Sequence, residues 1–141
     1  MLPGTGIAQD VSLEVDVLIA VPEFRGCISP AFDFCHRITL WRLGDKGFTK
    51  AGERKCRSLG PGERAARLSQ MGVKVLLCGA IGSELAQDIR GRGIAVISGL
   101  SGEVLEIVAA YASETLDHPK FRMPGAPSGV VAGDARKEVE P

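Results

Sequence analysis

The sequence predicts an α/β domain with one mixed five-stranded sheet flanked by helices, and three observations support this class. Short apolar runs bounded by Gly or Pro indicate buried strands. The turn Gly44-Asp45-Lys46-Gly47 indicates a hairpin of two antiparallel strands. Helical segments alternate with the strands of the second half, and right-handed crossovers make those strands parallel to the first. The predicted strand order is 3-2-1-4-5.

Three strands are expected in the first part of the domain. The first is the apolar run 17–21, which we expect Pro22 to end. Residues 22–35 are expected to form a long loop because they are rich in Pro, Gly and Ser. Residues 36–43 contain many β-formers and predict the second strand. The third returns from Phe48, and its charged residues predict a place at the edge of the sheet.

Three helices and two further strands should follow. The pattern predicts helices over 63–71 and 83–90, and buried strands over 73–78 and 94–97. Ser101 is a natural N-cap for the last helix. The inner face of that helix should be the set with helical spacing: Leu105, Val108, Ala109 and Ala112.

The chain divides into three parts by composition. Residues 16–117 should form a single domain, preceded by a loose leader over 1–15. Residues 118–141 are rich in Pro, Gly and charge, which predicts a disordered tail.

Charge and hydropathy exclude several classes of protein. The 17 basic residues balance the 17 acidic ones, which argues against a nucleic-acid binder. No apolar run approaches the roughly 20 residues of a membrane helix. The first residues also lack the pattern of a signal peptide. We therefore expect a cytoplasmic protein with no nucleic-acid or membrane partner, whose cysteines stay reduced.

The predicted topology brings the four cysteines to one edge of the sheet. Cys27 follows the first strand, and Cys35 with His36 precedes the second. Cys56 follows the third strand and Cys78 closes the fourth. The strand directions place all of these at the carboxyl end of the first strand, where open α/β sheets bind ligands.

The same edge should attract anions. The turns before the three helices, including the one between Gly79 and Gly82, would offer free N–H groups and the positive ends of helix dipoles. Thiolates select soft metals and iron–sulfur clusters, so an anionic metal–sulfide cluster would suit this edge. Nearby positive charge comes from four residues: Arg25, Arg54, Lys55 and Arg57.

The cysteines are not expected to play equal parts. We expect Cys27 and Cys35 to be metal ligands outside the core, with His36 or Cys56 assisting. Cys56 lies among basic residues, which indicates a solvated loop. Cys78 ends an apolar strand and should pack in the core.

Three segments resemble the dinitrogenase iron–molybdenum cofactor biosynthesis family. They are Val17 to Pro22 with the following Gly26-x-Ile28-Ser29-x-x-Phe32, then Gly72 to Gly82, and Gly93-Ile94-Ala95-Val96 with Ser98 to Tyr111. The similarity covers roughly residues 16–116. It implies a ribonuclease H-like three-layer fold and a non-enzymatic accessory protein. Such a protein would bind iron–molybdenum cofactor, its precursors or another molybdenum cluster, and would work with other cluster-assembly proteins.

One departure from that family concerns the first loop. Many members read Ser-x-His-Phe-Gly, and their histidine is thought to contribute to cluster binding. This chain reads Ser29-Pro30-Ala31-Phe32-Asp33, so that role cannot pass to Ala31. Three residues near Ala31 in the sequence could take the place of the missing histidine: Cys27, Cys35 and His36.

Other functions remain open at this point. The domain could be a regulatory or interaction module of the same fold without a cluster. It could hold structural zinc through Cys27, Cys35, His36 and Cys56, although the paired spacing of common zinc modules is missing. A two-metal nuclease is disfavoured because the candidate carboxylates do not converge on one site.

Overall fold

The computed structural model describes residues 16–123. Its strands are β1 (Val17–Phe24), β2 (Cys27–Ile28), β3 (Arg37–Gly44), β4 (Gly47–Lys55), β5 (Val75–Leu77) and β6 (Ala95–Ile97). Its helices are α2 (Pro61–Gln70), α3 (Ser83–Gly91) and α4 (Val104–Ala112), with short 3-10 helices η1 (Phe32–Phe34) and η2 (Pro119–Phe121). The expected leader, 1–15, and residues 124–141 of the expected tail lie outside the described residues.

The sheet has six strands instead of the predicted five, and its main path, β4-β3-β1-β5-β6, follows the predicted order 3-2-1-4-5. Strand β1 is antiparallel to β3 and parallel to β5. The charged strand β4 lies at the edge, as predicted. The short strand β2 was not expected; it pairs only with the end of β1. We call the end of the sheet where β1, β4, β5 and β6 finish the upper edge.

Pro22 does not end the first strand. Strand β1 continues to Phe24 and turns through Arg25 and Gly26, both with positive φ, into β2. A proline lacks only the N–H group, and the carbonyl of Pro22 still accepts a hydrogen bond from the Ser29 N–H at 2.8 Å. The expected loop 22–35 is therefore a strand end, a tight hairpin and the η1 turn.

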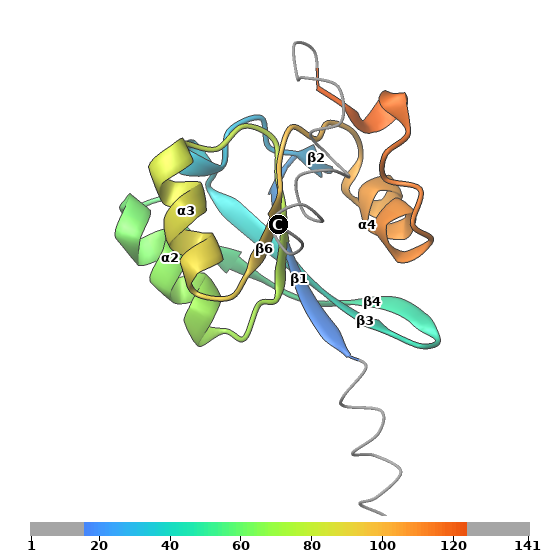
Figure 1. Ribbon diagram of the computed structural model, residues 1–141, viewed down its shortest axis with the longest axis horizontal. Coiled ribbons are helices and arrows are strands. Elements are labelled where there is room, and N and C mark those ends of the chain that lie inside the picture. Colours follow the sequence, from blue (N-terminus) through green and yellow to red (C-terminus); the bar gives the residue numbers. More distant parts are fainter. Residues whose placement is uncertain (1–15, 124–141) are drawn as a thin grey trace, which may run out of the picture.

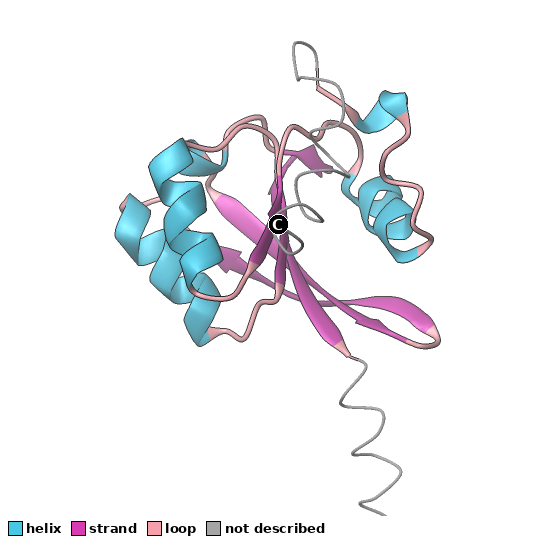
Figure 2. Ribbon diagram, in the orientation of Figure 1, coloured by secondary structure: helices cyan, strands magenta, loops and turns pink. Residues whose placement is uncertain are grey.

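Helices cover both faces of the sheet and make three layers. Helices α2 and α3 pack side by side on one face and α4 covers the other (Figure 1). Figure 2 shows the strands between these two groups of helices. Each face has its own apolar core, one beneath α2 and α3 and one beneath α4. No helix among residues 16–123 is long and apolar enough to cross a membrane.

Helix α4 begins later and faces differently from our expectation. Ser101 is not its N-cap, because the helix starts at Val104, whose N–H donates to the Gly26 carbonyl at 3.0 Å. Leu105 is exposed, and the buried residues are Val104, Ile107, Val108 and Ala110. The helix is apolar on nearly all sides, so spacing alone could not identify its inner face.

Residues 118–123, which we assigned to the tail, pack on the domain. Phe121 in η2 is buried in the core beneath α4. Its carbonyl accepts the Ser101 N–H at 2.8 Å, and the Met123 N–H donates to the Gly99 carbonyl at 2.8 Å. Burial of Phe121 therefore keeps residues 118–123 packed on the domain, although their composition alone assigns them to the tail.

Two loops cross in close contact at the upper edge. The Ala80 N–H donates to the Pro30 carbonyl at 2.7 Å, and the Phe32 N–H donates to the Ala80 carbonyl at 2.8 Å. A Cβ atom on Gly79 would lie 2.6 Å from the Pro30 carbonyl oxygen. Only glycine therefore allows the loop before α3 to approach the loop before η1 this closely.

Gly79→Ala should destabilise the fold by about 1–3 kcal/mol, because a backbone oxygen cannot move aside cheaply. Gly62→Ala is the matched control: this glycine lies in α2 with nothing within 4 Å of the added carbon. The control should be neutral or stabilising by up to about 1 kcal/mol. Urea unfolding at constant m-value measures both changes, and equal midpoints would contradict the close approach.

Candidate functional site

Cys35 and Cys56 form a buried thiol pair on the side of the sheet covered by α2 and α3. Their Sγ atoms lie 3.3 Å apart, and each residue is only 2% exposed. Cys35 lies between η1 and β3, while Cys56 directly follows β4. The Cys56 N–H donates to the His36 carbonyl at 2.9 Å, so the β3–β4 pairing holds the two thiols together. We had expected Cys35 outside the core and Cys56 in a solvated loop, and both expectations of exposure are wrong.

The guanidinium of Arg64, in the first turns of α2, lies against the thiol pair. Its Nη1 group lies 3.3 Å from the sulfur of Cys35 and 3.3 Å from that of Cys56. Arg64 is 3% exposed, so its charge is removed from water. The same nitrogen donates to the carbonyls of Phe32 at 3.2 Å and Cys35 at 3.0 Å, and Nε donates to Leu59 at 3.1 Å.

Arg64 makes the thiol pair a favourable place for one negative charge. Within residues 16–123, the hydrogen-bond partners of its side chain are carbonyl oxygens and the two sulfurs, and none is a carboxylate. A buried cation without a carboxylate partner is stabilised by an anion beside it. A thiolate in the pair supplies that anion.

The hydrogen bond between the two thiols shifts their pKa values in opposite directions. The hydrogen bond with Cys35 lowers the pKa of Cys56 to about 7, and the positive charge of Arg64 acts in the same direction. The hydrogen bond with Cys56, followed by burial, raises the pKa of Cys35 above that of an ordinary thiol. Near neutral pH the pair can therefore hold one thiolate and one thiol. A thiolate is the form of cysteine that acts as a nucleophile and a metal ligand.

The N-termini of α2 and α3 already have carboxylate partners from this chain. The Gly82 N–H, before α3, donates to Asp33 Oδ1 at 2.9 Å. The Gly60 N–H, before α2, donates to Glu63 Oε1 at 2.8 Å. We had expected these turns to offer free N–H groups to an anion. Asp33 is the residue that stands where the resembling family has glycine, and here it occupies the place that such an anion would take at Gly82.

The remaining predicted site residues are distributed along the upper edge. His36 is exposed, and its backbone carbonyl accepts the Cys56 N–H. Cys78 is fully buried in the same core, as expected. Cys27 is exposed on β2, where it pairs with Phe24 of β1 and bridges to Glu103 before α4. Among residues 16–123, no three His, Cys, Asp or Glu side chains converge as ligands for a metal ion.

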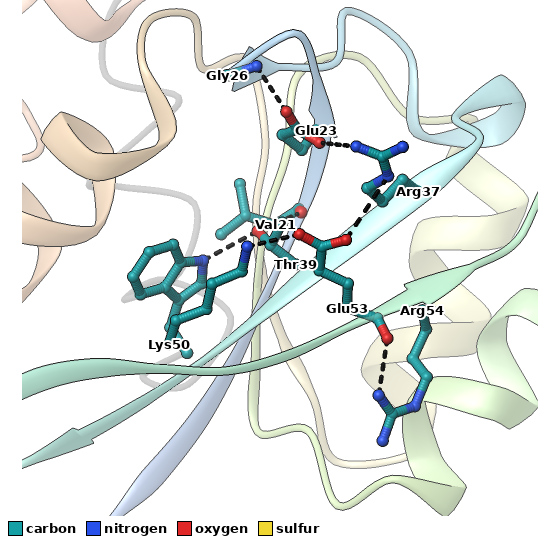
Figure 3. Close-up of polar contacts among 9 residues, drawn as sticks. Val21, Glu23, Gly26, Arg37, Thr39, Lys50, Glu53 and Arg54 are labelled. Atoms are coloured by element: carbon teal, nitrogen blue, oxygen red, sulfur yellow. Dashed lines mark hydrogen bonds and ion pairs between the residues drawn. The ribbon is translucent and has the colours of Figure 1, made fainter.

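A pocket of about 470 Å³ opens on the opposite side of the upper edge, beside α4. Trp41 lies in its lining, and its indole N–H donates to Thr39 Oγ1 at 2.9 Å. Figure 3 shows Arg37 between Glu23 and Glu53, and Lys50 paired with Glu53. The pocket lining contains three carboxylates and one lysine: Glu23, Glu53, Glu103 and Lys50.

Arg64 is the functional residue that the sequence analysis missed. It lies four positions before the buried Leu68, so it falls on the inner stripe of α2. That spacing was visible in the sequence. An arginine is rarely buried, however, so its residue type indicates a surface position despite the spacing.

Comparisons with known proteins agree with this architecture. The family described as dinitrogenase iron-molybdenum cofactor matches residues 15–114. The crystal structure of PH0822 has a TM-score of 0.65 at 18% identity, covering 77% of this chain and 97% of its own. MJ0327 from Methanocaldococcus jannaschii has a TM-score of 0.58 at 13% identity, covering 80% and 99%.

A third solved structure has a related fold. The apo form of the orange protein from Desulfovibrio gigas has a TM-score of 0.55 at 23% identity, covering 78% of this chain and 94% of its own. At these identities the structures establish the fold alone. No curated protein matches the chain in sequence.

Replacing Arg64 should raise the pKa of the thiol pair. In Arg64→Met the cation is lost, so the pH at which thiolate absorbance near 240 nm appears should rise by about one unit or more. Arg64→Lys, which keeps the charge, should shift less. A Cys27→Ser background removes the signal of the exposed thiol.

Arg67→Met is the matched control for this experiment, because Arg67 is an exposed residue of the same helix. It should leave the titration unchanged. Far-UV circular dichroism verifies that each variant is folded. An unchanged titration in folded Arg64→Met would contradict the role given to the guanidinium.

Proposed function

Because the chain belongs to the dinitrogenase iron–molybdenum cofactor family, we propose that it is a small accessory protein that carries an anionic metal–sulfur cluster. The cargo would be an iron–molybdenum cofactor-like cluster or another molybdenum cluster, passed to or from other cluster-assembly proteins in the cytoplasm. The protein itself would perform no catalysis. The observation that carries the proposal is the contact of Arg64 with both sulfurs of the Cys35–Cys56 pair.

The chemistry of the pair supports soft-metal binding. Thiolates are preferred ligands of molybdenum–sulfur and iron–sulfur centres. The lowered pKa of Cys56, about 7, supplies one thiolate near neutral pH. His36 follows Cys35 directly in the sequence, and its exposed imidazole would offer a further nitrogen. Because the described residues do not supply three converging ligands, the remaining coordination would come from the sulfides of the cluster.

Charge supports the approach of an anion from this side. Arg54, Lys55 and Arg57 are exposed around Cys56. They would attract a negatively charged cluster over roughly one Debye length, about 8–10 Å at physiological salt. Cys56 itself is only 2% exposed, so cargo uptake requires the structure around the thiol pair to open. Cys27, on the side of α4, would be a second and separate exposed thiol.

Anaerobic incubation with tetrathiomolybdate, a molybdenum–sulfide anion, tests the proposal. The parent should retain molybdenum after desalting, and Cys35→Ser/Cys56→Ser should retain at least about 10-fold less because its hydroxyls are poor soft-metal ligands. Elemental analysis and the visible spectrum measure the retention. Equal retention by parent and double variant would contradict binding at the pair.

Two further variants complete the experiment. Cys27→Ser should behave as the parent; loss of metal in this variant alone would assign the ligand to β2 instead. Lys55→Glu/Arg57→Glu changes only exposed side chains, so it tests attraction without disturbing the core. Its uptake should be weaker than that of the parent and less sensitive to salt.

A second candidate function is an interaction domain of the same fold that holds no cluster. The observation in its favour is the Asp33 carboxylate at the Gly82 N–H, together with Ala31 at the position of the histidine found in many family members. Both changes remove features that would hold an anionic cluster.

The variant Ala31→His/Asp33→Gly discriminates between the two functions. If the parent takes up no molybdenum and this variant does, the interaction domain is the better description. If the parent already takes up molybdenum, the change should add little. Ala31→Ser/Asp33→Gly is the control without the imidazole.

A further inference from the structure

The thiol pair is arranged for a bond between its two sulfurs. The Sγ atoms of Cys35 and Cys56 lie 3.3 Å apart, whereas a disulfide has an S–S length of about 2.05 Å. The backbone hydrogen bond from Cys56 to His36 keeps the two segments adjacent at 2.9 Å. Bond formation therefore requires the two sulfurs to approach by about 1.2 Å more.

The geometry points to a dithiol redox centre: Cys35 and Cys56 close reversibly to a disulfide when the protein meets a peroxide. This chemistry requires no bound cluster. It adds an oxidant-sensing function to the chain, with hydroperoxides as the class of substrate and small dithiols as the class of reductant.

The oxidation balances in two steps. The Cys56 thiolate attacks a peroxide oxygen, the O–O bond breaks, and a sulfenic acid forms with release of hydroxide, which takes a proton to become water. The Cys35 sulfur then attacks the Cys56 sulfur and the S–O bond breaks. The leaving hydroxide takes the Cys35 proton as a second water. Two thiols and one hydrogen peroxide thus give one disulfide and two waters, with two electrons transferred to the peroxide.

The residues around the pair indicate which thiol reacts with the peroxide and which one resolves the sulfenic acid. Arg64 Nη1 contacts both sulfurs at 3.3 Å, so its charge favours the anionic form of the attacking sulfur. Cys56 lies between the exposed basic residues Lys55 and Arg57, whereas Cys35 lies between Phe34 and His36, and neighbouring positive charge favours a reactive thiolate. Cys56 is therefore the peroxide-reactive thiol and Cys35 the resolving thiol.

The burial of the thiol pair determines which reagents can reach it. Each cysteine is 2% exposed, so a small peroxide should reach Cys56 more readily than a bulky thiol reagent. Cys27, by contrast, is exposed. Large thiol reagents should modify Cys27 first, and this order separates the two classes of cysteine experimentally.

Oxidation would also alter the surroundings of Arg64. A disulfide carries no negative charge, so the guanidinium loses its anionic neighbour. The bond also links the segment after η1 to the turn before α2. Where the proposed cargo binding holds, oxidation would block it, because a disulfide is a poor soft-metal ligand.

The experiment uses the full chain, reduced and free of metal, treated with a small excess of hydrogen peroxide. Unreacted thiols are then blocked with N-ethylmaleimide in denaturant. The expected product has two of its four thiols lost, a mass lower by about 2 Da before alkylation, and a peptide linking Cys35 to Cys56. Dithiothreitol should restore all thiols.

Three variants test the assignment. Cys27→Ser should form the same bond, and Cys56→Ser should leave Cys35 unmodified. Cys35→Ser should stop at a Cys56 sulfenic acid, which a dimedone label reports. Over-oxidation of Cys56 in the parent without a linked peptide, or disulfides only through Cys27, would overturn the proposal. Molybdenum uptake is measured without oxidant, so failure of either proposal leaves the other standing.

Discussion

The contact between Arg64 and the thiol pair joins segments that sheet pairing alone would not hold. One guanidinium binds the carbonyls of Leu59, Phe32 and Cys35 and lies beside both sulfurs. It also lies 5.9 Å from the centre of the Phe32 ring. Burying this charge is costly, and dipoles, a π face and a thiolate together offset the cost. The stability of the buried Arg64 charge therefore depends on Cys35 and Cys56.

The same contact organises the whole α2–α3 side of the upper edge. By holding Phe32 and Cys35, Arg64 fixes both sides of the η1 turn, and that turn carries Asp33 to the Gly82 N–H. The loop before η1 in turn presses on Gly79. The helix N-termini and the thiol pair therefore form one connected unit. A change in the charge of the thiol pair would alter its interaction with Arg64. Because Arg64 holds the η1 turn, the loops around any ligand at this edge would be affected too.

The sequence was sufficient for the topology because apolar runs, a hairpin turn and crossover handedness are local or nearly universal signals. It failed for the side chains that meet across loops. Cys56 was assigned to solvent because Lys55 and Arg57 flank it, yet successive residues of an extended strand point to opposite sides, so charged neighbours are compatible with a buried cysteine. The pairing of Cys35 with Cys56 depends on tertiary contacts between residues 21 apart in the sequence. The buried Arg64 was hidden by the general rule that arginines lie on the surface.

The two sides of the upper edge differ in charge, and this difference limits what each can bind. The pocket beside α4 is lined by Glu23, Glu53 and Glu103, and Arg37 and Lys50 pair with the first two of these carboxylates, so its described lining offers an anion no unpaired lysine. The thiol side has a buried guanidinium, that of Arg64, and Lys55 and Arg57 flank Cys56 in the sequence as exposed residues. An anionic cargo would therefore be drawn to the thiol side rather than to the pocket beside α4. The strength of such binding would be governed by the ionisation and oxidation state of two sulfurs, since these decide whether Arg64 already has its negative charge.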